Sequence, residues 1–251
     1  MDESRPVNTP SDTNSKLPSG KGHTEERQFE KPYRQLIGSL MYLAIATRLD
    51  SSFTVNRLAQ FNESYQDVHW SAAKRVLRYL RETENYELTY TKDNLGLRGY
   101  SDADHANDES DRVSYTGYVF ILSGAAITWR SQKQRSVAIS STEAEYVALS
   151  ETSREATYLL NLMTEMNLPE LTKISIGTDN QGAKHIAENS VCHSRTKHIA
   201  TRYHFVRQVL KDGKVTVIYT PTDMMPADVF TKPLPGPAHY RCMKDIGVIV
   251  C

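Results

Sequence analysis

The sequence has 251 residues, of which 39% are hydrophobic and 24% are charged, and its 30 basic residues balance its 30 acidic ones. This composition is typical of a soluble globular protein and excludes a protein that binds nucleic acid through bulk positive charge alone. The sequence contains no run of about 18 apolar residues and no N-terminal signal pattern, so we expect an intracellular protein that does not cross a membrane.

The chain begins with two segments of different character. Residues 1–31 are rich in Pro, Ser, Thr, Lys and Gly and have few large apolar side chains, so we expect a disordered leader or linker. Over 32–84, apolar residues recur at helical spacing in the phrases YRQLIGSLMYLAIATR, SFTVNRLAQF and DVHWSAAKRVLRYLRET. We therefore predict a compact module of three helices, with Asp67 as the N-cap of the third.

Residues 85–235 are predicted to form an α/β domain. Four successive strands, arranged as an antiparallel meander, are expected over 86–91, 97–102, 116–124 and 125–131. The later elements are predicted in the order helix, strand, helix, helix, strand and short helix, over 140–166, 173–180, 181–189, 196–213, 214–220 and from 226. Residues 236–251 are expected to form a C-terminal tail or a short helix.

Four acidic residues stand at the ends of these predicted elements. Asp102 ends the first long strand, and Asp179 ends the strand after the long helix. Glu145 lies in the first turns of that helix, and Asp228 lies at the start of the last one. If the two strands are neighbours in one sheet, the four carboxylates converge, and their mutual repulsion calls for cations. Oxygen ligands favour hard ions such as Mg²⁺, and two such ions about 4 Å apart can promote hydrolysis of a phosphodiester.

Further phrases point to a known family. Eight of them occur in one order between about residues 33 and 235: YRQLIGSLMYLAIATR, AAKRVLRYLRET, GYSDADHAND, SYTGYVF, SSTEAEYVAL, TDNQGA, TKHIATRYHF and PADVFTKPLP. In them the sequence resembles the ribonuclease H domain of copia-type retrotransposon polyproteins, with the connection segment that precedes it. The resemblance implies a ribonuclease H-like mixed five-stranded sheet flanked by helices, after a small helical connection module. It also implies cleavage of the RNA strand of RNA:DNA hybrids with two Mg²⁺ or Mn²⁺ ions.

The resemblance selects particular acids as catalytic residues and metal ligands, namely Asp102, Glu145, Asp179 and Asp228. In YSDAD the family's acid follows the small polar residue that ends the strand, which selects Asp102. Asp104 shares the same strand face and stays a reserve ligand. In STEAEY the family's acid directly precedes the aromatic residue, which selects Glu145. Glu143 is the other reserve, because with Ser140 as N-cap it would complete a capping box.

A basic segment over 193–214 offers a surface for nucleic acid. Lys and Arg greatly outnumber acidic residues there, and phosphate contacts supply most of the affinity for nucleic acid. A solvated helix face would carry the same kind of charges. Because this segment is predicted next to the acids, we expect contacts with an RNA:DNA hybrid from six residues, Arg195, Lys197, Arg202, Tyr203, His204 and Arg207.

Other functions remain open. The chain departs from the family pattern, for example with His105 where Trp is common, so the alternative is a catalytically inactive retrotransposon remnant that binds nucleic acid or protein. A transposase or integrase of the same broad fold is disfavoured, because such acid series usually end with Glu on a late helix, whereas Glu145 comes second here. No Tyr-x-Asp-Asp polymerase motif occurs. We therefore expect a fragment without the reverse-transcriptase palm, with other parts of a Pol polyprotein as partners, in the cytoplasm or the nucleus.

Overall fold

The computed structural model describes residues 4–14, 17–18, 31–92, 96–106, 111–168, 171–189 and 200–250. The first elements of the chain are three helices, α1 (Tyr33–Ala46), α2 (Ser52–Ala59) and α3 (Asp67–Glu82). The 3₁₀ turn η2 (Leu49–Ser51) lies between the first two. Their apolar faces meet in a core of their own, as the sequence predicts. The N-cap of α3 is Gln66, whereas Asp67 is already its first helical residue.

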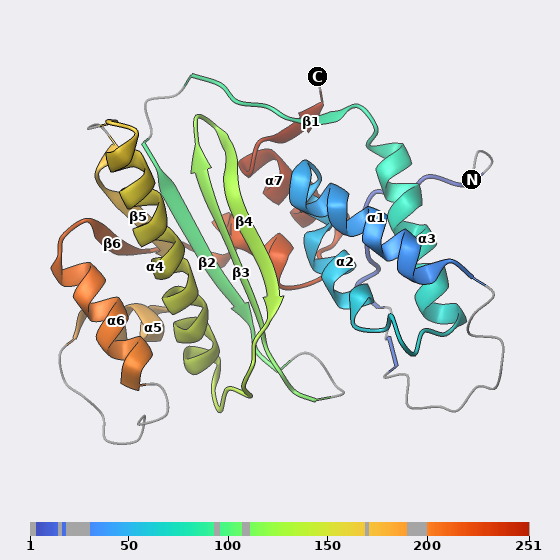
Figure 1. Ribbon diagram of the computed structural model, residues 1–251. Coiled ribbons are helices and arrows are strands. Elements are labelled where there is room, and N and C mark those ends of the chain that lie inside the picture. The colour runs from blue at the N-terminus through green and yellow to red at the C-terminus, as the bar shows by residue number, and fades with distance from the viewer. Residues whose placement is uncertain are drawn as a thin grey trace.

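A mixed five-stranded sheet forms the centre of the molecule (Figure 1), with the strand order β4-β3-β2-β5-β6. Its strands are β2 (Arg98–Asp104), β3 (Tyr115–Leu122), β4 (Ala125–Lys133), β5 (Ile174–Thr178) and β6 (Val215–Tyr219). β2, β3 and β4 are antiparallel neighbours, while β5 runs parallel to β2 and β6 runs parallel to β5. The predicted mixed five-stranded sheet is confirmed.

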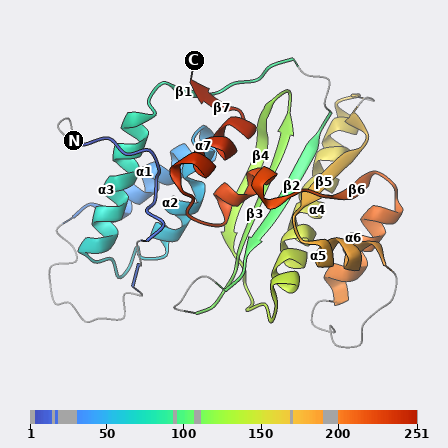
Figure 2. The same ribbon diagram turned by 180° about the vertical axis from the view of Figure 1, so that it is seen from behind.

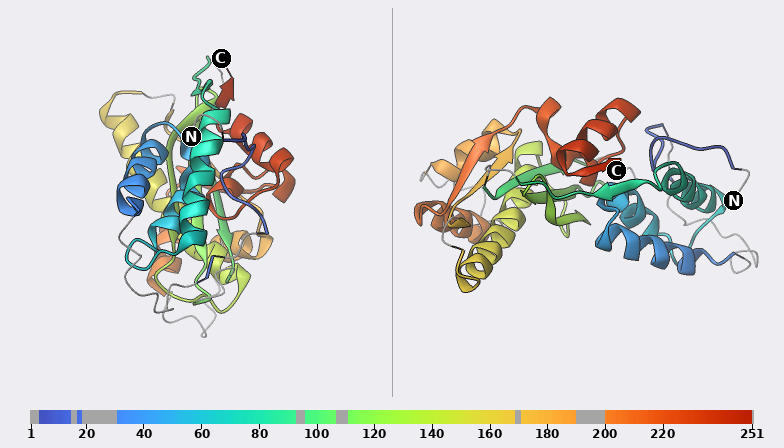
Figure 3. Two further views of the ribbon diagram at one scale, coloured as in Figure 1. Left: turned by 90° about the vertical axis from the view of Figure 1, so that its right-hand side faces the viewer. Right: turned by 90° about the horizontal axis from the view of Figure 1, so that it is seen from above.

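Helices cover both faces of this sheet. One face carries the helices α4 (Ser141–Glu165), α5 (Gln181–Glu188) and α6 (Ala200–Lys211). The other face carries the 3₁₀ turn η6 (Pro226–Phe230), which follows η5 (Thr222–Met224), and the helix α7 (Gly236–Asp245). Seen from behind and from above, α4 and α7 lie on opposite sides of the strands (Figures 2 and 3). Within the described residues, no helix has the length and apolar character needed to cross a membrane.

The alternation of side chains along β2 and β3 decides which helix meets which face. On the α4 face, the Thr152 hydroxyl donates a hydrogen bond to Ser101 Oγ over 2.9 Å. On the other face, Gly117 is the register partner of Asp102, and a Cβ atom at Gly117 would lie 2.8 Å from Phe230 Cβ. Glycine is therefore needed at this position, because η6 packs directly on the strand backbone.

The strand predicted at 86–91 does not join the meander. Its first residues form β1 (Tyr86–Leu88), which pairs antiparallel with β7 (Val248–Val250) in a separate two-stranded sheet. The residues expected as a tail or short helix therefore form both α7 and β7. The prediction was wrong about the partner of this strand because its pairing joins the middle of the chain to its far end, and no local pattern reports such a contact.

Part of the segment 1–31, predicted to be disordered, packs against α3. Arg75 donates a hydrogen bond to Thr9 Oγ1 over 2.9 Å. His69 accepts the backbone N–H of the α3 N-cap at Nδ1, so its Nε2 carries the proton and donates to the Pro18 carbonyl over 3.1 Å. Residues 1–3, 15–16 and 19–30 lie outside the described residues, so disorder of the segment stays a prediction. Polar side chains of α3 hold the leader, and composition alone does not reveal such partners.

The three-helix module shares a buried core with the sheet and with α7. Leu49 of η2 and Tyr79 of α3 are 0% exposed, and they belong to one apolar cluster with Val119 of β3, Phe230 of η6 and Met243 of α7. Burial of such side chains is the main source of stability in a fold of this kind. The module and the sheet therefore stabilise each other through residues that are far apart in the chain.

A buried polar network lies at the same junction. The carboxylate of Asp50, which is 1% exposed, accepts hydrogen bonds from Arg48 Nε over 3.1 Å and from Arg48 Nη2 over 2.8 Å. It also accepts one from the Tyr79 hydroxyl. Because that hydroxyl has a single hydrogen, His239 Nε2–H of α7 donates to the Tyr79 oxygen over 3.0 Å. Burial lowers the pKa of His239 to about 4, so the imidazole is neutral in the folded protein.

We expect His239 to lower the free energy of unfolding as the pH decreases from about 6.5 toward 4, against the opposite contributions of Glu145 and Asp228, whose raised pKa values stabilise the folded state at low pH. The folded pKa of His239, about 4, lies below the ordinary 6.5, so the unfolded chain binds more protons in this window. The loss attributable to His239 is about 2 kcal/mol between pH 7 and pH 5. Urea unfolding of both proteins measures it: between pH 7 and pH 5 the free energy of unfolding of His239→Gln should shift by about 2 kcal/mol in favour of the variant relative to the wild type. The exposed His204 is the control, and equal slopes for wild type and His239→Gln would exclude this role.

Candidate active site

β2 and β5 bring two acids to the same edge of the sheet. Tyr100 and Gly177 are register partners in this parallel pair. Asp102 and Asp179 each stand two residues further along, so they reach the edge together. Asp102 is 2% exposed, whereas Asp179 is partly exposed and accepts a hydrogen bond at Oδ2 from the Thr222 hydroxyl over 2.7 Å.

The start of α4 adds a third acid at this edge. Ser140 is the N-cap of α4, and Glu145 lies five residues further on. Ligand oxygen atoms of Asp102, Glu145 and Asp179, which we call the acid triad, all lie within 4.8 Å of one another. Glu145 is 6% exposed, and its Oε2 atom lacks a hydrogen-bond partner among the described residues. Burial, and then the charges of Asp102 and Asp179, raise the pKa of Glu145 to about 10.

Asp228 lies beside the triad and is paired with a lysine. The Lys232 ammonium is 2.9 Å from Asp228 Oδ1 and 3.7 Å from Asp102 Oδ2. Burial, and then the charge of Asp102, raise the pKa of Asp228 to about 7. The Thr231 hydroxyl donates a hydrogen bond to Asp102 Oδ2. The structure thus brings all four predicted acids together and divides them into the acid triad and an Asp228–Lys232 pair.

The two reserve acids lie outside the triad. The Glu143 N–H donates to Ser140 Oγ over 3.1 Å, and the Glu143 carboxylate accepts the Ile139 N–H over 3.0 Å. These bonds satisfy backbone groups at the start of α4, which is the capping role expected for an acid at this position. Asp104 lies at the end of β2 and is not one of the three clustered acids. The geometry favours Glu145 over Glu143, and Asp102 over Asp104, as ligands.

The donor set of the triad fits a hard divalent cation. All three groups are carboxylates, the ligands that Mg²⁺ and Mn²⁺ prefer, and among the described residues no thiolate or imidazole contributes to the cluster. A buried carboxylate oxygen without a partner is costly, and the unsatisfied Oε2 atom of Glu145 is such an atom. A bound cation would satisfy this oxygen and offset the repulsion within the triad.

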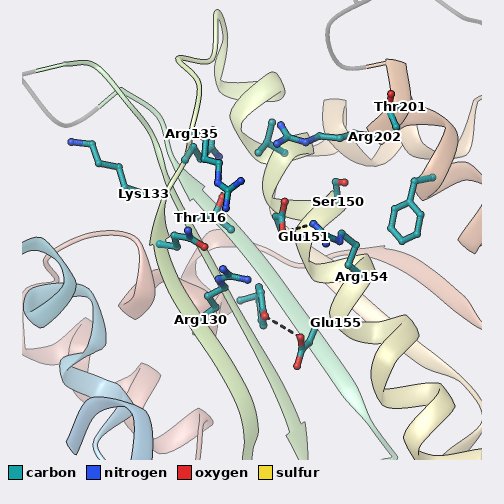
Figure 4. Close-up of a pocket in the computed structure, with 15 residues that line it drawn as sticks. Thr116, Arg130, Lys133, Arg135, Ser150, Glu151, Arg154, Glu155, Thr201 and Arg202 are labelled. Atoms are coloured by element: carbon teal, nitrogen blue, oxygen red, sulfur yellow. Dashed lines mark hydrogen bonds and ion pairs between the residues drawn. The ribbon is translucent and has the colours of Figure 1, made fainter. Parts of the chain in front are cut away.

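A basic groove of about 740 Å³ lies between the strands β3 and β4 and the helices α4 and α6 (Figure 4). Five basic side chains line it against two acidic ones, and the basic ones are Arg130, Lys133, Arg135, Arg154 and Arg202. The Glu155 carboxylate accepts hydrogen bonds from the Thr128 and Tyr118 hydroxyls, and Glu151 forms an ion pair with Arg154 over 3.4 Å. Within the part of the chain that the structure describes, Arg135 and Arg202 form no ion pair.

The groove is tied to chain segments that carry two acids of the triad. Gln134, which lines the groove, donates hydrogen bonds from Nε2 to Thr116 Oγ1 and to the Ala144 carbonyl, both over 3.0 Å. Ala144 directly precedes Glu145 in α4, and Thr116 is the register partner of the residue after Asp102. The groove and the triad are therefore built on neighbouring residues of the same elements.

The residues predicted to bind nucleic acid differ in their location and exposure in the structure. Arg195 and Lys197 lie outside the described residues. Arg202 lines the groove, and His204 is exposed. Tyr203 is 7% exposed and packs against Tyr146 with ring centroids 4.3 Å apart, so its ring belongs to the core and a contact with nucleic acid is not supported. The guanidinium of Arg207 lies over the Tyr203 ring, 5.8 Å from its centroid.

Five basic residues of the site were not predicted from the sequence, namely Arg130, Lys133, Arg135, Arg154 and Lys232. Lys232 stands four residues after Asp228, a spacing at which acidic and basic side chains pair. This spacing could have predicted the Asp228–Lys232 pair from the sequence. The three arginines come from β4, from the loop after it and from α4. No local pattern joins them, because only the packing of α4 on the sheet brings them to one groove.

The chain is similar to segments of Pol polyproteins. No family model matches it. It is 43% identical over 246 residues to the retrovirus-related Pol polyprotein from transposon RE2 of Arabidopsis thaliana, a match that covers 98% of this chain and 17% of that polyprotein. The chain therefore spans about a sixth of the length of this curated relative.

Two further comparisons cover shorter stretches. The chain is 50% identical over 129 residues to the secreted RxLR effector protein 161 of Plasmopara viticola, a match that covers 51% of this chain and 91% of that protein. Among solved structures, LC11-RNase H1, isolated from compost, aligns with a TM-score of 0.42 and 12% identity over 54% of this chain and 92% of its own.

We expect Mn²⁺ or Mg²⁺ to raise the melting temperature of the wild type and not that of Glu145→Gln. An ion present at about 100 times its dissociation constant stabilises the folded state by about 2.7 kcal/mol. Differential scanning fluorimetry, with EDTA as the reference, measures the shift. Glu143→Gln is the matched control, because Glu143 lies two residues before Glu145 in the same helix and caps the start of that helix. Equal loss of the shift in both variants would speak against the triad as the ion's site.

Proposed function

The chain belongs to the Pol polyproteins of copia-type retrotransposons, and on that premise we propose that it is a ribonuclease H that hydrolyses the RNA strand of RNA:DNA hybrids. The observation that carries this proposal is the acid triad, whose three carboxylates lie within 4.8 Å of one another. Such a cluster is unfavourable without cations, and its position at one edge of a ribonuclease H-like sheet gives the cations a catalytic use.

The four acids of the site would bind two divalent ions. Asp102, Glu145 and Asp179 would hold one divalent ion, and Asp102 with Asp228 would hold a second. When bound, the ions supply activation of a water molecule and stabilisation of the leaving oxygen of the phosphodiester. Packing on both faces of β2 holds the carboxylates rigidly, so the protein does not reorganise when charge develops.

The basic groove would bind the sugar-phosphate backbone of the hybrid. Arg135 and Arg202 have guanidinium groups that form no ion pair within the described residues, and guanidinium binds phosphate in a bidentate manner. A hybrid is recognised by its shape and its 2′-hydroxyl groups, so no base-specific contact is needed. Other parts of a Pol polyprotein are the proposed protein partners, because the relative in which this segment occurs is much longer.

A second candidate is a binding module without catalysis. The similarity to a protein named as a secreted effector favours it, because that protein matches over 91% of its length to part of this chain. The four acids of the site are all present in this chain, which favours the enzyme. Hydrolysis of a hybrid separates the two candidates.

The wild type is expected to cleave the RNA strand of a labelled RNA:DNA hybrid in the presence of Mg²⁺. Asp179→Asn should lower the rate by at least about a hundredfold, because it removes one carboxylate charge from the triad. Asp212→Asn, at the exposed end of α6, is the matched control and should keep the wild-type rate. A folded wild type that binds the hybrid and leaves it intact would support the second candidate instead.

The double variant Arg135→Ala with Arg202→Ala is expected to bind the hybrid about tenfold more weakly. Each phosphate contact that is lost should also lower the slope of log affinity against log salt by about 1. Fluorescence anisotropy in the Asp179→Asn background measures binding without cleavage. Arg241→Ala, on α7 at the other face of the sheet, is the control. An unchanged salt slope in the double variant would rule out the groove as the backbone site.

A further inference from the structure

Lys232 lies in the candidate active site beside two of its acids. Its ammonium is 2.9 Å from Asp228 Oδ1 and 3.7 Å from Asp102 Oδ2. The side chain of Lys232 is only 30% exposed, and that of Asp102 is 2% exposed, so water screens this contact weakly. Asp102 is thus shared between the acid triad and a cation that belongs to the chain itself.

The backbone holds Lys232 next to these acids. The Lys232 N–H donates to the Asp228 carbonyl over 3.2 Å, and the preceding Thr231 is 0% exposed with its hydroxyl bonded to Asp102. Pro233 follows and restricts the backbone of Lys232 to extended conformations. The lysine therefore projects from a fixed turn of the site, and only rotation of its side chain can move the ammonium away.

We propose that Lys232 supplies the second positive charge of the site in the free protein, so that the free protein binds one divalent ion, in the acid triad. A second ion enters only by displacing the Lys232 ammonium from Asp102 and Asp228. This inference rests on the proposed function, because it assumes that the triad binds metal. Its physical basis is that an ammonium and a divalent ion repel each other and compete for the same carboxylate oxygens. Bound nucleic acid adds negative charge at the site, which couples entry of the second ion to substrate binding.

The test counts Mn²⁺ ions bound to the protein in the absence of nucleic acid, by equilibrium dialysis with electron paramagnetic resonance. The wild type and Lys232→Arg should bind one ion per chain. Lys232→Met should bind two, with a second-site affinity at least about tenfold higher than that of the wild type. Lys184→Met is the matched control and should bind one, because Lys184 forms the same i,i+4 type of pair with Glu188 outside the site.

Several outcomes would overturn the inference. Two ions in the wild type, or one ion in a Lys232→Met variant with a native circular dichroism spectrum, are incompatible with it. If Lys232→Met does not fold, a Mn²⁺-soaked crystal of the wild type decides. One anomalous peak at the triad, with Lys232 still on Asp228, supports the inference, and two peaks refute it. A wild type that cleaves the hybrid and binds two ions rejects this inference alone, whereas a wild type that binds no ion rejects the proposed function.

Discussion

The repulsion between carboxylates at one edge of the sheet is the constraint on which the rest of this structure depends. The acids themselves cannot hold this arrangement, so packing elsewhere must do it. The register of β2 with β5 sets Asp102 and Asp179 level with each other. The hydrogen bond between Thr152 and Ser101 attaches α4 to β2, which places Glu145 at the same edge. The site is therefore maintained by the sheet and the long helix, and its unfavourable charge is available for binding cations.

The second face of the sheet contributes as much to the site as the first. η6 lies so close to β3 that only glycine fits at position 117, and this contact positions Asp228 and Lys232 beside Asp102. η6 in turn belongs to the apolar cluster that joins the three-helix module, the sheet and α7. The buried network of Arg48, Asp50 and Tyr79 lies at this junction, and a buried ion pair of this kind is strongly destabilising when one partner is lost. The helical module thus supports the position of the fourth acid through the core.

Charge in this molecule is organised locally, although the chain as a whole is neutral. The acids gather at the edge where β2, β5 and α4 meet, and the arginines gather in the groove between α4 and β4. Gln134 joins the two regions through its bonds to Thr116 and Ala144. A substrate that carries phosphates can be attracted by the groove and approach the acids only where cations offset their charge. Lys232 is the cation that the chain itself places there.

The sequence alone determined the mixed sheet, the helical module, the long helix and the four acids, because each has a local signature in periodicity, capping or family phrases. The basic helix, expected to end at residue 213, ends at Lys211, and Gly213 two residues later has a positive φ of 71°. Tertiary structure decided what depends on contacts between distant segments. It paired β1 with β7, placed described residues of the leader on α3, buried Tyr203 against Tyr146, and assembled the groove from β3, β4, α4 and α6. These features have no local signature, since the partner that stabilises each of them lies elsewhere in the chain and is met only on folding.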